Sequence, residues 1–159
     1  MKNLFKTLAL TAALSALSLT AMAAEPALHQ TVTNPQALAV QSAGTENFTG
    51  EVVMAVIYGP QAPSKSYAAT VTFAPGARTY WHVHEMGQTL IVTGGIGYTQ
   101  EWGKAPVMLK PGDIVRCPPG VKHWHGAAPH SSMTHLALSE AGGTVTWLEE
   151  VSAKDYPSE

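Results

Sequence analysis

Two histidines separated by one residue, His82 and His84, are the side chains in this sequence best suited to bind a metal ion. Side chains alternate between the two faces of a β-strand, so both imidazoles would project from the same face. Gln88 follows shortly after, and His123 supplies a third imidazole from a later segment. Three imidazoles and one amide would form a metal site that leaves room for a further ligand, which predicts metal-assisted chemistry.

The alternative is that these are structural histidines on a polar sheet face. The close pair, the later partner and the neighbouring glycines favour metal binding instead. His125 should share the face of His123 and could be a fifth ligand, an acid–base group or a core histidine. We favour acid–base chemistry, because an imidazole titrates near neutral pH. His135 either lines the same pocket or supports the ligands from behind.

The segments that must position these residues are short strands separated by turns. Pro and Gly clusters such as Gly59-Pro60, Pro75-Gly76 and Pro118-Pro119-Gly120 break the sequence repeatedly. This spacing predicts an all-β sandwich or barrel with a brief helical segment near Val151 to Tyr156. The expected strands cover 51–58, 67–73, 79–84, 88–93, 96–101, 107–109, 114–117, 122–126, 133–139 and 144–148.

The beginning of the chain has the features of a secretory signal peptide. Lys2 and Lys6 precede an apolar run, and Ala21-Met22-Ala23 fits the rule for signal-peptidase cleavage. The run is too short for a membrane-spanning helix. We therefore expect a signal peptide at 1–23, a loose arm at 24–47, a single domain at 48–159 and a periplasmic location.

Composition restricts the partners. A net charge of −2 with 13% charged residues gives no basic surface, so we expect neither nucleic acid nor, after signal cleavage, a membrane as partner. Cys117 is the only cysteine, which excludes an intramolecular disulfide. We expect it to be a small buried apolar residue in a strand. The four tryptophans are expected to serve packing, with Trp81 and Trp124 pointing away from the histidines.

The order of glycines and histidines resembles the two sequence motifs of the cupins. Gly76, His82, His84, Gln88 and Gly95 match the first motif, and Gly112, Pro118-Pro119-Gly120 and His123 match the second. The resemblance implies a single-domain cupin fold, a double-stranded β-helix or jelly-roll barrel. Two positions depart from the common pattern: Gln88 replaces a glutamate, and Ala127 replaces an asparagine.

Longer segments are similar to the manganese-dependent hydroxynitrile lyases among the small bacterial cupins. These segments are 73–79, 87–93, 123–129 and 133–137, and the similarity extends from about Phe48 to Tyr156. It implies that the metal ligands are His82, His84, Gln88 and His123. It also implies manganese as the cofactor, although histidine and oxygen ligands equally suit iron, zinc, nickel or copper.

The resemblance implies that a small cyanohydrin is cleaved to aldehyde and cyanide, with His125 removing the proton and His135 assisting it. An aromatic aldehyde would fit an apolar pocket of Ala69, Val71, Met133 and Ala137. Two alternatives remain: an oxygenase, isomerase or decarboxylase, and a periplasmic module that binds a ligand or metal without turnover. We expect a homodimer or homotetramer that pairs through 51–58 and the arm.

Overall fold

The computed structural model describes residues 29–157, and within this range the protein is all-β, as predicted. Its one helical element there is the 3-10 turn η1 (Pro35–Ala37). The strands are β1 (Gln41–Ser42), β2 (Phe48–Thr49), β3 (Val52–Tyr58), β4 (Ser66–Phe73), β5 (Arg78–Thr79), β6 (His82–His84), β7 (Gln88–Gly95), β8 (Gly97–Glu101), β9 (Val107–Leu109), β10 (Ile114–Cys117), β11 (His123–Ala127), β12 (Met133–Glu140) and β13 (Val145–Trp147).

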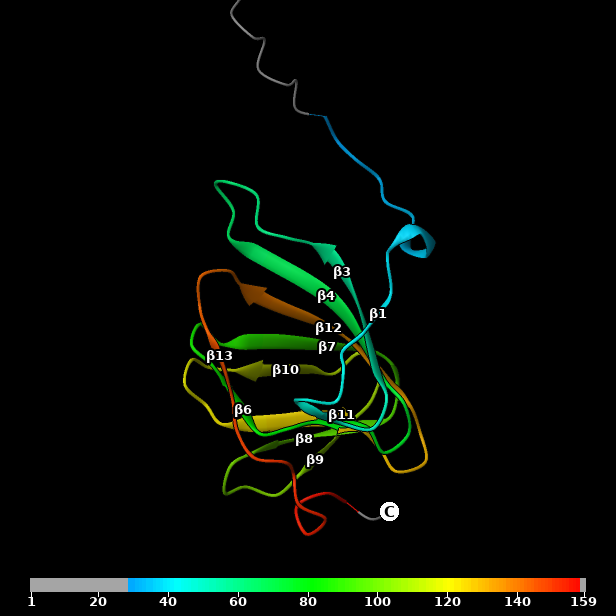
Figure 1. Ribbon diagram of the computed structural model, residues 1–159, viewed down its shortest axis with the longest axis vertical. Coiled ribbons are helices and arrows are strands. Elements are labelled where there is room, and N and C mark those ends of the chain that lie inside the picture. Colours follow the sequence, from blue (N-terminus) through cyan, green and yellow to red (C-terminus); the bar gives the residue numbers. More distant parts are fainter. Residues whose placement is uncertain (1–28, 158–159) are drawn as a thin grey trace, which may run out of the picture. The chain divides into compact units, whose positions relative to one another are not determined.

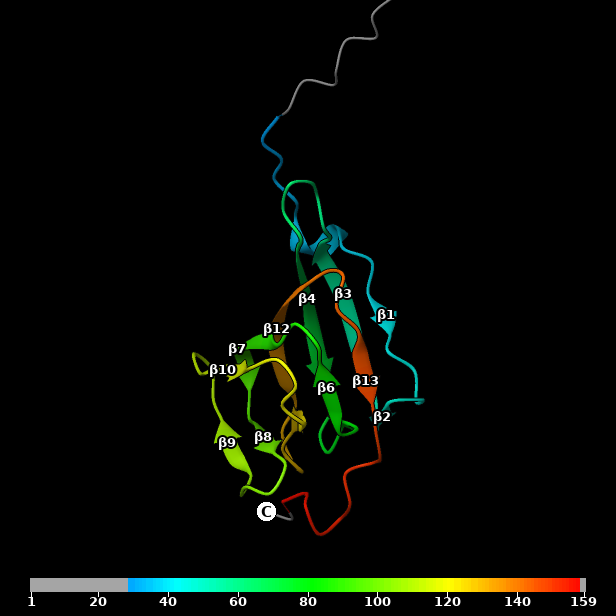
Figure 2. The ribbon, with the colours of Figure 1, turned by 90° about the vertical axis from the view of Figure 1, so that its left-hand side faces the viewer.

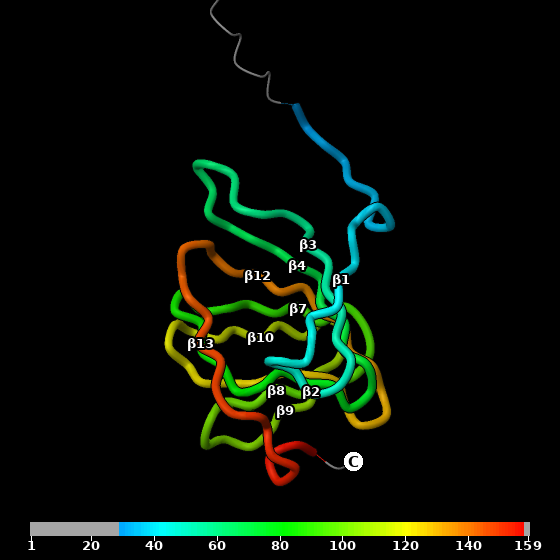
Figure 3. The backbone as a smooth tube through the Cα atoms, in the orientation of Figure 1, coloured from blue at the N-terminus to red at the C-terminus, as the bar shows by residue number. Residues whose placement is uncertain are grey.

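The strands form two antiparallel sheets that face each other (Figures 1 and 2). One sheet has the order β1-β3-β4-β12-β7-β10, and the other has the order β13-β6-β11-β5-β2, with β8 and β9 added through β11. The chain crosses repeatedly between them, so that β12 lies between β4 and β7 although it comes much later in the sequence (Figure 3). The predicted jelly-roll architecture is therefore confirmed.

Apolar side chains between the sheets form the main core. Phe73, Leu90 and Met133 are fully buried there, and Ala127 closes it from the facing sheet. Along β4, β7 and β12 the buried positions alternate with half-buried ones, whereas β11 is buried on both faces. The core occupies one part of the space between the sheets and leaves the histidine-bearing part open.

The outer face of the second sheet carries another cluster, and the C-terminal segment covers it. Trp81 and Trp124 are buried there against Val151, away from the histidines, as alternation predicts. The Tyr156 hydroxyl donates a hydrogen bond to the Ala127 carbonyl at 2.8 Å. The predicted helical segment is a single turn, in which the backbone N–H of Tyr156 donates to the Ser152 carbonyl.

One predicted strand is interrupted. The segment expected at 79–84 divides into β5 and β6, because the backbone at Tyr80 and Trp81 leaves the ladder between them. Their N–H groups donate to carbonyls outside the sheet, those of Asn47 and Glu149. The interruption changes the phase of the side chains, so that Thr79 and His82 face the same cavity although they are three residues apart.

The predicted signal peptide at 1–23 lies outside the described residues. Part of the predicted arm is described, and its strand β1 pairs with β3 of the same chain. Within residues 29–157, no helix is long and apolar enough to span a bilayer. Residues from Thr33 onward belong to one compact unit.

Candidate metal centre

The strand pair β6 and β11 brings three histidines together. His82 and His123 are directly opposite each other in this pair, and their ring centroids are 4.2 Å apart. The ring of His84 lies 5.1 Å from that of His82 and 5.7 Å from that of His123. The predicted common face of His82 and His84 is thus observed, and the later histidine joins it.

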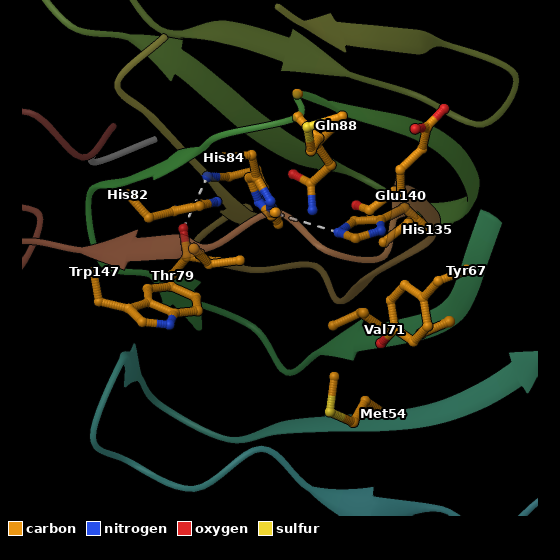
Figure 4. Close-up of a pocket in the computed structure, with 18 of the residues that line it drawn as sticks. Met54, Tyr67, Val71, Thr79, His82, His84, Gln88, His135, Glu140 and Trp147 are labelled. Atoms are coloured by element: carbon orange, nitrogen blue, oxygen red, sulfur yellow. Dashed lines mark hydrogen bonds between the residues drawn. The ribbon is translucent and has the colours of Figure 1, made fainter. Parts of the chain in front are cut away.

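Gln88 reaches this cluster from the start of β7, after a tight turn. Gly87 in the turn has φ +76°, and a Cβ there would lie only 2.8 Å from the Cys117 carbonyl oxygen, so the turn requires glycine. The side-chain Oε1 of Gln88 then lies 3.4 Å from His123 Nε2. The four predicted ligands therefore lie close together, and Figure 4 shows three of them, His82, His84 and Gln88, at the same part of the pocket.

Hydrogen bonds to the backbone fix the protonation of two of these rings. Nδ1 of His82 lies 2.9 Å from the Tyr80 carbonyl, and Nδ1 of His123 lies 3.0 Å from the Val121 carbonyl. A carbonyl only accepts hydrogen bonds, so each Nδ1 carries the proton and each Nε2 presents a lone pair. This is the arrangement by which metal-binding histidines are usually oriented.

The same protonation leaves an unmatched contact. The lone pair of His123 Nε2 faces the Oε1 of Gln88, with the amide oriented as in the structure, and both atoms are acceptors. A divalent cation shared between them would satisfy both. Among the described residues, ring nitrogens of His82, His123 and His125 also lie within 4.8 Å of one another, a spacing suited to a metal ion. This group fits a divalent metal; it contains His125, which was predicted as the acid–base residue, and it does not contain the predicted ligand His84.

Burial keeps these imidazoles neutral. Desolvation lowers the pKa of His82 and His123, and neighbouring histidines lower that of His82 further. Burial, with the charge of His123, lowers the pKa of His84 to about 4. Neutral imidazoles are the form that binds metal, so the site holds its ligands ready at neutral pH.

His125 and His135 form a second pair behind the ligands. Nε2 of His135 lies 3.2 Å from Nδ1 of His125, and both rings pack against Phe73. Burial lowers the pKa of His125 well below its ordinary value and that of His135 to about 4, so the near-neutral titration expected for His125 from the sequence is not found. The backbone N–H of His125 donates to Thr79 Oγ1 at 3.2 Å, which fixes the position of β11 here.

A cavity of about 280 Å³ opens onto the histidines. Its walls include Ala69, Val71 and Ala137, as predicted from alternation. Met133 was predicted to line it as well, and this was wrong: its side chain is fully buried in the core, against the backbone at Gly97. Figure 4 shows further lining residues that sequence reasoning did not assign, among them Thr79, Tyr67, Glu140 and Trp147.

The sequence signals for these residues were weak. In an unbroken strand, alternation would place Thr79 and His82 on opposite faces, so the sequence did not indicate that Thr79 lines the cavity. Trp147 stands in a short strand whose alternation with Thr146 shows two faces but does not reveal which face meets the site. Only the pairing of β13 with β6 settles that question.

The jelly-roll barrel with histidines on facing strands defines the class of the protein as a cupin. Residues 69–138 match the family described as a cupin domain. The (R)-mandelonitrile lyase of Granulicella tundricola is 50% identical over 111 residues, which cover 69% of this chain and 85% of that protein. This chain therefore belongs to the cupin family.

Solved structures agree. A cupin-like protein from Thermotoga maritima has 41% identity and a TM-score of 0.69, covering 72% of this chain and 89% of that one. A polyketide cyclase from Streptomyces resistomycificus has a TM-score of 0.67 at 15% identity, covering 80% of this chain and 91% of that one, which shows the fold alone. A relative named as a lyase supports enzymatic activity, and the histidine group supports a divalent metal.

Proposed function

We propose that this protein is a metal-dependent carbon–carbon lyase of the hydroxynitrile type, which cleaves a cyanohydrin to an aldehyde and hydrogen cyanide. The observation that carries the proposal is the pairing of two functions in one cavity. Ring nitrogens of His82 and His123, suited to a metal, lie beside His125, which forms with His135 a hydrogen-bonded pair suited to proton transfer. The similarity to a protein named (R)-mandelonitrile lyase supports the same reaction.

The metal would be held by His82, His84, Gln88 and His123, with manganese as the proposed ion. When bound, it would supply Lewis-acid stabilisation of the negative charge that develops on the substrate oxygen. None of the four ligands is a carboxylate, so the ion keeps its full positive charge apart from what the substrate neutralises. This favours an anionic transition state over a neutral ground state.

His125 is the proposed base. Its Nδ1 is engaged with His135, so Nε2 is the nitrogen left to accept the hydroxyl proton of the cyanohydrin. The carbon–carbon bond to the nitrile then breaks, its electron pair leaves with cyanide, and the carbon–oxygen double bond forms. Returning the proton from His125 to cyanide releases hydrogen cyanide and restores the neutral imidazole.

His135 has the role of a positioning residue. It holds the His125 ring through the 3.2 Å hydrogen bond, and within the described residues its own Nδ1 has no hydrogen-bond partner. For Nε2 of His125 to accept the substrate proton, Nδ1 of His125 must carry the hydrogen of this bond and donate it to Nε2 of His135.

The test is benzaldehyde release from racemic mandelonitrile under nitrogen, by the mature protein stripped of metal and then reloaded with manganese. Release that depends on manganese and exceeds the free-metal background is the expected result. No release from protein with stoichiometrically bound metal would contradict the proposal. Oxygen uptake with phenolic substrates by that same protein would instead indicate a cupin oxygenase.

A further inference from the structure

Trp147 lies at the edge of the histidine cluster and is incompletely packed. Its ring centroid is 4.8 Å from that of His82, with 36° between the planes, and 5.5 Å from that of Phe48. The residue is nevertheless 36% exposed, so one part of the indole is covered by the protein and another part borders the cavity. Figure 4 shows it beside His82 and Thr79.

The register of β13 explains this position. Trp147 pairs directly with His82, and Val145 pairs directly with His84. Directly opposite residues of an antiparallel pair project from the same face, so the two apolar side chains point into the cavity with the two histidines. β13 thereby places one apolar group next to each predicted ligand of β6.

Specific contacts at its beginning hold β13 in place. The Glu85 carboxylate accepts hydrogen bonds from both the N–H and the hydroxyl of Thr144, each at 3.0 Å, and the Glu85 N–H donates to the Thr144 carbonyl. Next to this contact, Gly143 packs so closely on Met86 that a Cβ would collide with its side chain. The wall formed by Trp147 is therefore built in a defined position.

We propose that Trp147 determines specificity by binding the aromatic ring of the substrate, which makes benzylic cyanohydrins the preferred substrate class. This inference rests on the proposed lyase function. The uncovered part of the indole would be removed from water by a substrate ring, and two aromatic rings gain additional energy in tilted or offset contact. A small aliphatic cyanohydrin reaches the histidines without covering the indole, so it gains little from this residue.

The experiment compares mandelonitrile with lactonitrile, a small aliphatic cyanohydrin, in the manganese-loaded enzyme. Trp147→Ala should lower kcat/KM for mandelonitrile about tenfold, mainly through KM, as expected for the loss of an aromatic contact and its buried area. The value for lactonitrile should change less than about twofold. Trp147→Phe should restore most of the loss. Trp102→Phe is the matched control, since Trp102 is exposed and lies outside the cavity lining, and it should change neither substrate.

An equal decrease for both substrates, or a loss of bound manganese in Trp147→Phe, would overturn the proposal and show that Trp147 only supports His82. A second measurement separates this inference from the proposed function: tryptophan fluorescence of the metal-free protein titrated with benzyl alcohol. A signal that is lost in Trp147→Phe and kept in Trp102→Phe supports the ring subsite even if no cyanohydrin is cleaved. Cleavage of mandelonitrile at an unchanged kcat/KM in Trp147→Ala would refute the subsite while leaving the lyase function intact.

Discussion

Gln88 is the proposed ligand at which residue chemistry has the largest expected effect on the proposed reaction. Its Oε1 lies 3.4 Å from His123 Nε2, and it is neutral where a carboxylate would carry charge. An amide is a weak donor but leaves the charge of the ion uncompensated. Compared with a carboxylate, the amide is therefore expected to lower the affinity for the metal and to raise its Lewis acidity.

Gln88→Glu is accordingly expected to bind manganese more tightly and to cleave mandelonitrile about tenfold more slowly, equivalent to about 1.4 kcal/mol of transition-state stabilisation. Affinity would be measured by competition with a chelator, and the rate by benzaldehyde release at full metal occupancy. Gln88→Ala is the control for loss of the ligand and should weaken metal binding. A Glu variant that is fully loaded and as fast as the wild type would show that charge at this position does not control the rate.

At the scale of elements, β11 carries two histidines of the site, His123 and His125, and its backbone lies very close to that of Ala77 and Arg78. A Cβ at Gly126 would lie 2.5 Å from the Ala77 carbonyl oxygen and 2.5 Å from Arg78 Cα. Backbone atoms cannot move aside as a flexible side chain can. This contact therefore fixes the distance between β11 and β5, and with it the position of His125 above Thr79.

Gly126→Ala is expected to destabilise the fold by about 3 kcal/mol, the upper part of the usual range for overpacking. Thermal unfolding should shift downward by roughly 10 °C. Gly94→Ala is the matched control, because Gly94 also lies in a strand and a Cβ there would meet nothing within 4 Å. A melting temperature for Gly126→Ala equal to that of Gly94→Ala would contradict the argument.

Most of the fold could be predicted from sequence, because Pro and Gly turns separate segments with clear alternation. The positions of His82, His84 and His123 followed from the same rule and from motif spacing. The strand break and the true lining of the cavity could not be predicted, because contacts with distant segments determine them. The break at Tyr80 and Trp81 depends on carbonyls from distant segments, and the bulge between Thr134 and His135 interrupts the pairing of β12 with β7 on the side where Met133 lies.

At the scale of the whole molecule, one end of β3 remains uncovered. β1 pairs with its first half, at Val53 and Met54, whereas Val56 and Tyr58 are 51% and 44% exposed. An apolar edge of this kind is an aggregation risk unless a partner covers it. We therefore propose that the protein is a homodimer or homotetramer assembled through this edge.

Light scattering of the mature protein after size exclusion should give a mass of two or more chains. Val56→Lys combined with Tyr58→Lys should shift the mass toward the monomer, because each buried lysine would carry an unpaired charge. The control is Lys104→Ala, which removes a positive charge at an exposed turn and should leave the mass unchanged. A monomeric wild-type protein at micromolar concentration would contradict the proposed assembly.

We propose that the histidines divide the work of the site, so that His123 holds the metal and His125 moves the proton. This division is tested most directly by the rate of benzaldehyde release per bound manganese in His125→Ala and in His123→Ala. For His125→Ala we expect unchanged manganese content and a rate lower by about 10²-fold or more, the usual contribution of a general base. For His123→Ala we expect loss of manganese together with activity. Loss of manganese from His125→Ala equal to that from His123→Ala would contradict the proposal and make His125 a ligand.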